Sequence, residues 1–130
     1  MRLLLDTCTF LWLIWDEAEL ASGARDVARD PDHEVFLSPV SVWEALVKHQ
    51  IGKLQLKTSE SAWRHFTTQR VAHHVESLPL DEASLAHVTT LPGLHRDPFD
   101  RLLICQAIEH GLAIVTPDPA IQRYPVKTLW

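Results

Sequence analysis

The sequence predicts an α/β fold in which helices pack on a mainly parallel sheet, and three observations lead to this prediction. Short apolar runs recur along the chain, and stretches with helical apolar periodicity separate them. This alternation is typical of βα units and a parallel sheet. The 130 residues also contain no internal repeat, low-complexity tract or Gly/Ser linker, so we expect one domain over residues 1–130.

The expected elements follow from apolar runs and from local start and stop signals. The expected strands cover residues 2–5, 34–37, 75–80, 112–115 and 126–130. The expected helices cover residues 7–15, 22–30, 39–50, 58–71, 81–89 and 97–110. Pro39 suits a first helical turn, and Gly52 suits the cap that follows the same helix. Thr58 is the expected N-cap of the next helix, and Gly111 ends the helix that begins near residue 97.

Composition and charge narrow the class of protein. The hydrophobic fraction of 46% supports a packed core, and no metal or disulfide is needed to hold it. Cys8 and Cys105 lie far apart, which favours reduced thiols. The apolar run after Met1 is too short for a signal sequence or a membrane span, so we expect a cytoplasmic, soluble protein. Acids outnumber bases 17 to 12, a balance that disfavours nucleic-acid binding unless cations neutralise clustered acids.

Two aspartates follow apolar runs that we expect to be strands of the same parallel sheet. Asp6 comes directly after the first run, and Asp118 comes three residues after the last buried one. In an open parallel sheet, ligands bind beyond the carboxyl ends of the strands, where the strand order reverses. Both aspartates are therefore expected at that edge.

Two more acids lie on apolar helical faces. Glu44 shares a predicted face with Val40, Val47 and Ile51, and Asp100 likewise shares one with leucine, isoleucine and alanine. A carboxylate on a core-facing stripe is costly unless it is paired or binds a metal. Both acids are therefore candidates for a functional site.

Each acid also has an ordinary structural interpretation. Asp97, directly before a proline, is a good N-cap, and Asp100 would suit the positive end of the same helix. Asp118 would also fit a cap or turn, Glu44 an ion-paired core position, and Asp6 the end of a strand. We interpret Asp97 as a cap and the other four acids together as a site, because all four fall at one predicted edge.

Four gathered carboxylates need neutralising charge. Two unit charges about 4 Å apart repel by about 4 kcal/mol at an effective dielectric near 20. Oxygen-only ligands suit Mg²⁺ or Mn²⁺, which support phosphodiester hydrolysis. Thr7 and Thr116 lie beside Asp6 and Asp118 and would orient ligands or water, although they also fit as plain strand and turn residues. Among the nearby cations, Arg101 is our preferred contact for substrate phosphate.

Four segments carry a resemblance to a known family: Leu3–Thr7, Ser41–Glu44, His95–Ala107 and Leu112–Asp118. Together they resemble the PIN domain and, more narrowly, the VapC toxins of bacterial toxin–antitoxin pairs. The resemblance spans essentially the whole chain, and its most specific part is the Arg-Asp-Pro-Phe-Asp-Arg run at residues 96–101.

The resemblance implies a three-layer α/β/α fold and a Mg²⁺- or Mn²⁺-dependent ribonuclease that hydrolyses RNA phosphodiester bonds. It also implies inhibition by a VapB-like antitoxin and pairing into a homodimer. The acidic positions of the family match Asp6, Glu44, Asp100 and Asp118. Cys8 stands where such toxins commonly carry histidine.

Other functions find less support in the residues. A haloacid-dehalogenase-like phosphatase needs a second aspartate two residues after Asp6, where this chain has Cys8. His73-His74 lacks the partner spacing of a zinc site. Trp43 and Trp63, on helices, are expected to pack in the core rather than stack on bases. The remaining alternative is a non-catalytic module whose acidic site receives a basic side chain of a partner.

Overall fold

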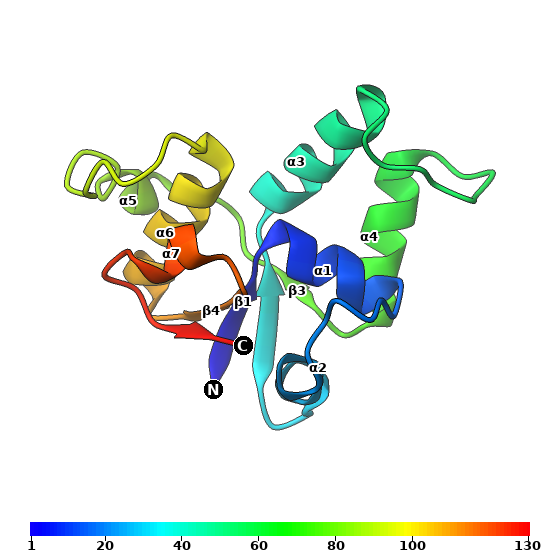
Figure 1. The fold of residues 1–130 in the computed structure, drawn as a ribbon, viewed down its shortest axis with the longest axis horizontal. Helices are drawn as coiled ribbons and strands as arrows, with labels where there is room; N and C mark the ends of the chain where they lie inside the picture. Colours follow the sequence, from blue (N-terminus) through cyan, green and yellow to red (C-terminus); the bar gives the residue numbers. More distant parts are fainter.

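A computed structural model describes all residues, 1–130, and contains a five-stranded sheet in which every pairing is parallel (Figure 1). The strand order is β3-β2-β1-β4-β5. The strands are β1 Arg2–Leu5, β2 Glu34–Leu37, β3 Glu76–Ser77, β4 Ala113–Val115 and β5 Thr128–Leu129. The predicted fold class is confirmed.

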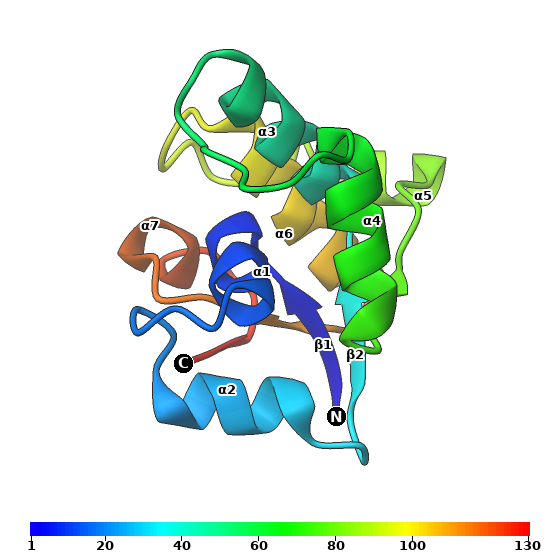
Figure 2. The same cartoon turned by 90° about the vertical axis from the view of Figure 1, so that its right-hand side faces the viewer.

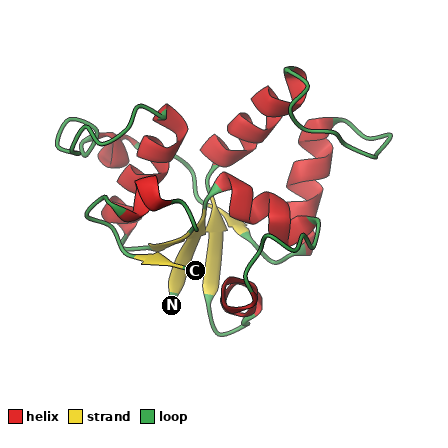
Figure 3. Cartoon of the chain, in the orientation of Figure 1, coloured by secondary structure: helices red, strands yellow, loops and turns green.

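Helices cover both faces of this sheet (Figures 2 and 3). The helices are α1 Thr7–Ile14, α2 Ser22–Arg29, α3 Pro39–Gln50, α4 Ala62–Ala72, α5 Glu82–Leu85, α6 Pro98–His110 and α7 Pro119–Gln122. None of them is both long and apolar enough to span a membrane.

Side-chain alternation along the strands divides the core into two layers. In β1, Leu3 and Leu5 face one core together with Phe10 of α1 and Phe66 of α4. Leu4 faces the opposite core, whose other members come largely from α6 and the segments after it. The three-layer α/β/α arrangement is therefore confirmed.

The strand order reverses beside β1, which positions the candidate site. From β1 the chain moves outward to β2 and β3, and then crosses back to place β4 on the other side of β1. The pairing of β1 with β4 sets Leu5 opposite Val115. The residues that follow these two strands, Asp6 and Thr116, therefore emerge side by side at the carboxyl edge.

Some predicted boundaries differ from the structure. The helix expected over residues 58–71 begins at Ala62, because Ser61 accepts the capping bond from the Arg64 amide. Thr58, expected to be the N-cap, instead accepts a bond from the Glu60 amide. The strand expected over residues 75–80 and the helix expected over 81–89 are each shorter, and the helix α7 was not predicted.

The prediction that Trp43 and Trp63 pack in the core is wrong. Their exposed fractions are 57% and 59%. Ile51, expected on the core-facing stripe of α3, is also exposed. The buried residues are Val40, Ser41, Glu44 and Ala45 in α3 and Phe66 in α4, so the two tryptophans and Ile51 lie outside the buried faces of these helices.

The end of α6 depends on one glycine. Gly111 has φ of 65° in the left-handed region, where it ends the helix. We expect Gly111→Ala to lower the free energy of unfolding by about 1 kcal/mol, because an L side chain is disfavoured in this conformation. A Cβ there would meet no atom within 4 Å, so the cost would come from the backbone alone.

The matched control is Gly93→Ala, where a Cβ also meets nothing within 4 Å and φ is not in the left-handed region. Urea unfolding of both variants measures the difference. An equal effect of the two substitutions would contradict the role given to Gly111.

Candidate functional site

Asp6 is a buried carboxylate that accepts hydrogen bonds from three residues, Thr9, Thr116 and Cys8. It follows β1 and caps α1, since its Oδ1 accepts a bond from the Thr9 amide at 2.9 Å. Its Oδ2 accepts a bond from the Thr116 hydroxyl. Burial raises the pKa of Asp6, and the hydrogen bonds from Thr116 and Thr9 oppose that shift. The side chain is thus fixed in place at a high cost in desolvation.

Cys8 contributes a weak contact to this carboxylate. Its Sγ donates to Asp6 Oδ1 at 3.3 Å. Burial, and next the charge of Asp6, raise the pKa of the Cys8 thiol. Cys8 and Cys105 are both free, and the raised pKa makes Cys8 a protonated donor rather than a nucleophile.

Asp118 reaches the same place from the other strand. It caps α7, with its Oδ1 accepting a bond from the Ala120 amide at 2.9 Å. The amide of Asp118 donates to the Thr116 hydroxyl oxygen at 3.0 Å. Thr116 therefore links Asp6 to the backbone of Asp118. The capping interpretation of Asp118 and its predicted position at the sheet edge are both confirmed.

Glu44 lies on α3, is only 7% exposed, and has two partners. Its Oε1 accepts a bond from the Thr7 hydroxyl at 2.6 Å, which joins α1 to α3. Its Oε2 pairs with Lys48 Nζ at 3.0 Å. The partly exposed Lys48 balances the buried charge, so the ion-paired interpretation of Glu44 fits the structure.

The N-terminus of α6 carries two more acids. Asp97 caps the helix as predicted, accepting bonds from the amides of Phe99 and Asp100. Asp100 is directed away from the helix, and its Oδ2 lies 3.3 Å from His95 Nε2. Burial, then the charge of Asp97, raise the pKa of Asp100 to about 7; the charges of Glu44 and Asp118 add to the shift.

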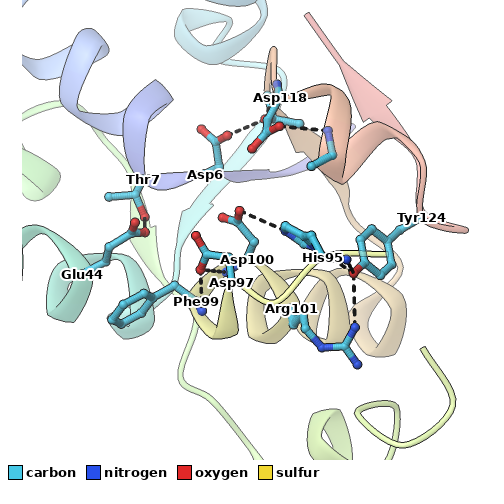
Figure 4. Close-up of polar contacts among 12 residues, drawn as sticks. Asp6, Thr7, Glu44, His95, Asp97, Phe99, Asp100, Arg101, Asp118 and Tyr124 are labelled. Atoms are coloured by element: carbon cyan, nitrogen blue, oxygen red, sulfur yellow. Dashed lines mark hydrogen bonds and ion pairs between the residues drawn. The ribbon is translucent and has the colours of Figure 1, made fainter. Parts of the chain in front are cut away.

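We call Asp6, Glu44, Asp97, Asp100 and Asp118 the acidic cluster. Figure 4 shows Asp6, Asp100 and Asp118 directed toward a common space, with Glu44 beside Thr7 at its side. No three Asp, Glu, His or Cys side chains are placed to hold one metal ion together in this geometry. Each acid is instead turned to its own donor, as expected for like charges that repel.

Sequence reasoning assigned no role to His95 or Tyr124, and it predicted a phosphate contact for Arg101. Figure 4 shows the Arg101 side chain directed away from the acidic cluster. Its guanidinium donates to Tyr124 Oη, Pro92 O and Val88 O. This placement gives no support to its predicted contact with substrate phosphate. Only the position of His95, five residues before Asp100, could have drawn attention to it.

Comparison with known proteins places this arrangement in a family. The fold and the acidic cluster define an α/β protein with carboxylates gathered at the switch point of a parallel sheet. A family model described as the PIN domain matches residues 3–127, and the chain therefore belongs to the PIN domain family.

Individual relatives agree with this family. The chain is 28% identical over 131 residues to a protein named Ribonuclease VapC22 from Mycobacterium tuberculosis, covering 98% of this chain and 97% of the relative. The fold is similar to that in VapBC2 from Rickettsia felis bound to a promoter DNA fragment, with a TM-score of 0.68, 16% identity and coverage of 100% and 99%. It is also similar to VapBC-5 of a toxin–antitoxin system from Mycobacterium tuberculosis, with a TM-score of 0.55, 20% identity and coverage of 98% and 95%.

The raised pKa of Asp100 has a consequence for stability. The pKa of this carboxyl is 3.8 in the unfolded chain and about 7 in the folded protein, so the folded state binds the proton more tightly. The stability that this proton contributes is therefore present at low pH and is lost as the pH rises to about 7. We expect Asp100→Asn to raise the free energy of unfolding in EDTA by about 1–2 kcal/mol more at pH 8 than at pH 5, after allowance for solvent screening.

Denaturant unfolding at the two pH values measures this difference. The matched control is Asp26→Asn, because Asp26 is exposed on α2. Parallel pH profiles for wild type and Asp100→Asn would show that the folded protein does not raise the pKa of Asp100.

Proposed function

We propose that this chain is a divalent-metal-dependent endoribonuclease that acts as the toxin of a toxin–antitoxin pair. Membership of the PIN domain family and the relative named as a ribonuclease support this proposal. The observation that carries it is the convergence of acids from distant parts of the chain. Asp6 and Asp118 meet at Thr116, and the charges of Glu44 and Asp118 reach Asp100.

The chemistry of the donor set fits Mg²⁺ or Mn²⁺. Every acid in the cluster offers hard oxygen ligands, and the negative charges that raise the pKa of Asp100 would be offset by a cation. In the proposed site Asp6, Glu44, Asp100 and Asp118 hold the metal, directly or through water. When bound, a divalent ion supplies Lewis acidity that activates water and offsets charge on a phosphodiester.

The other residues of the site orient these ligands. Thr116 fixes Asp6 through its hydroxyl, and Thr7 does the same for Glu44. Asp97 holds the first turn of α6 and so fixes the position of Asp100. Lys48 brings a positive charge to the edge of the cluster, where a phosphate would approach. In this proposal these neighbours fix the backbone and side-chain positions of the acids, which would turn from their present donors to the metal when it binds.

We also propose a VapB-like antitoxin as the partner protein, a homodimer as the working form, and a cytoplasmic location. The similarity to the VapBC-5 structure, whose name includes a toxin–antitoxin system, supports the first of these. Trp43 and Trp63 line an apolar groove of about 360 Å³ between α3 and α4, a surface that a protein partner would cover.

A second candidate function is a non-catalytic module whose acidic cluster binds a basic side chain. Two observations favour it. No three potential ligands are placed around a common ion position, and Glu44 is already paired with Lys48. Such a module would bind a basic peptide without Mg²⁺ or Mn²⁺ and would leave RNA intact.

The first test is RNA cleavage. We expect cleavage in Mg²⁺ or Mn²⁺, its loss in EDTA, and a fall of about 100-fold or more for Asp6→Asn, because metal catalysis contributes several kcal/mol to lowering the barrier. Asparagine retains a capping oxygen for α1, so folding is preserved. Asp26→Asn serves as the exposed control. Activity that persists in EDTA, or in Asp6→Asn, would refute the mechanism.

Calorimetric titration separates the two candidate functions. We expect wild type to bind Mn²⁺ with release of protons below pH 7, because ligand carboxylates must be ionised and the pKa of Asp100 is raised. Asp118→Asn should weaken the binding. Absence of binding at millimolar Mg²⁺ and Mn²⁺ would favour the non-catalytic module.

A further inference from the structure

A continuous chain of hydrogen bonds leads from Arg101 to Asp100 through two residues outside the acidic cluster. Arg101 Nη1 lies 3.1 Å from Tyr124 Oη, and Tyr124 Oη lies 2.7 Å from His95 Nδ1. His95 Nε2 then lies 3.3 Å from Asp100 Oδ2. Figure 4 shows these four side chains in sequence, with the imidazole between the phenol and the carboxylate.

The donors in this chain determine which nitrogen of His95 carries hydrogen. Arginine can only donate, and the backbone amide of His95 also donates to Tyr124 Oη, at 3.3 Å. These two donors fill the lone pairs of the phenol oxygen, so its own hydrogen is directed to His95 Nδ1. The Nδ1 atom is therefore an acceptor, and Nε2 carries the hydrogen that Asp100 Oδ2 accepts.

This network is anchored at both ends. Arg101 also donates to Pro92 O at 3.0 Å and to Val88 O at 3.2 Å, which ties it to the backbone before the loop of His95. Tyr124 is only 3% exposed and belongs to the core on the α6 side of the sheet. The phenol therefore has little freedom to move, and the imidazole is held by a fixed partner.

We propose that His95 is a positioning residue for Asp100, and that Tyr124 and Arg101 select the tautomer that allows it. The Nε2 hydrogen holds one carboxylate oxygen of Asp100 and leaves the other available to the acidic cluster. Metal-ligating carboxylates are commonly oriented by such outer hydrogen bonds. The inference deepens the proposed function and rests on it, since Asp100 is there a metal ligand.

Two substitutions of His95 separate its two contacts. His95→Gln places an amide N–H near the position of Nε2 and retains a donor to Asp100. His95→Asn reaches only as far as Nδ1, so it leaves Asp100 without that donor. We expect His95→Asn to weaken Mn²⁺ binding 10- to 100-fold in calorimetry, the range typical of lost outer-sphere partners. His95→Gln should stay close to wild type.

Kinetics on RNA gives a second comparison. In His95→Asn we expect kcat to fall while KM for RNA stays unchanged, because His95 orients a ligand and does not contact substrate. Thermal unfolding of each variant checks folding. Equal losses in the asparagine and glutamine variants would show that His95 merely fastens the loop to α6, and would overturn the proposal.

The tautomer can be measured without metal or activity. We expect ¹⁵N NMR of the metal-free protein at pH 8 to show His95 with Nδ1 unprotonated and Nε2 protonated. In Tyr124→Phe this preference should weaken, because the phenol hydrogen is gone. The signal is assigned by its absence in His95→Gln. Protonated Nδ1 in the wild type would overturn the proposal.

The outcomes separate this inference from the proposed function. Wild type that binds no Mn²⁺ and cleaves no RNA would overturn the proposed function, and with it the role of His95 toward a metal ligand. Wild type that binds Mn²⁺ while His95→Asn binds it equally well would overturn only the positioning of Asp100.

Discussion

The structure depends on the register between β1 and β4. With Leu5 opposite Val115, Asp6 emerges beside Thr116, and a hydroxyl from a residue 110 positions away reaches its carboxylate. A slip of one residue would turn the side chains of β1 to the opposite face and separate this pair. The cores on both faces prevent such a slip, since Leu3, Leu4 and Leu5 are fully buried. The packing of the two hydrophobic layers thus fixes the position of Asp6 at the carboxyl edge of the sheet.

Much of the fold could be predicted because the decisive signals are local. Asp97 and Gly111 mark the ends of α6 within the residues next to it, and the apolar run after Arg2 marks β1 without reference to the rest of the chain. Trp43 and Trp63 could not be placed in this way. Both lie outside the buried faces of their helices, and which face is buried depends on how the helices pack against the rest of the chain.

In the candidate site too, the contacts set by strand ends or helical spacing could be predicted, and those made through loops could not. Asp6 and Asp118 follow strands, so the parallel topology alone brought them to one edge. Glu44 and Lys48 pair across four residues of one helix, a spacing that the sequence shows directly. The contact of His95 with Tyr124 joins residues 29 positions apart through a loop, and no local pattern encodes it.

Three acids of the cluster are also helix N-caps: Asp6 caps α1, Asp97 caps α6 and Asp118 caps α7. The same carboxylates therefore determine both where these helices begin and where negative charge is concentrated between them. In a homologue that no longer needs the carboxylates, asparagine, serine or threonine at these positions would still cap the helices. Aliphatic residues there would let the first helical turns fray. Loss of activity would then leave a well-folded scaffold whose sequence still marks the former site with small polar residues.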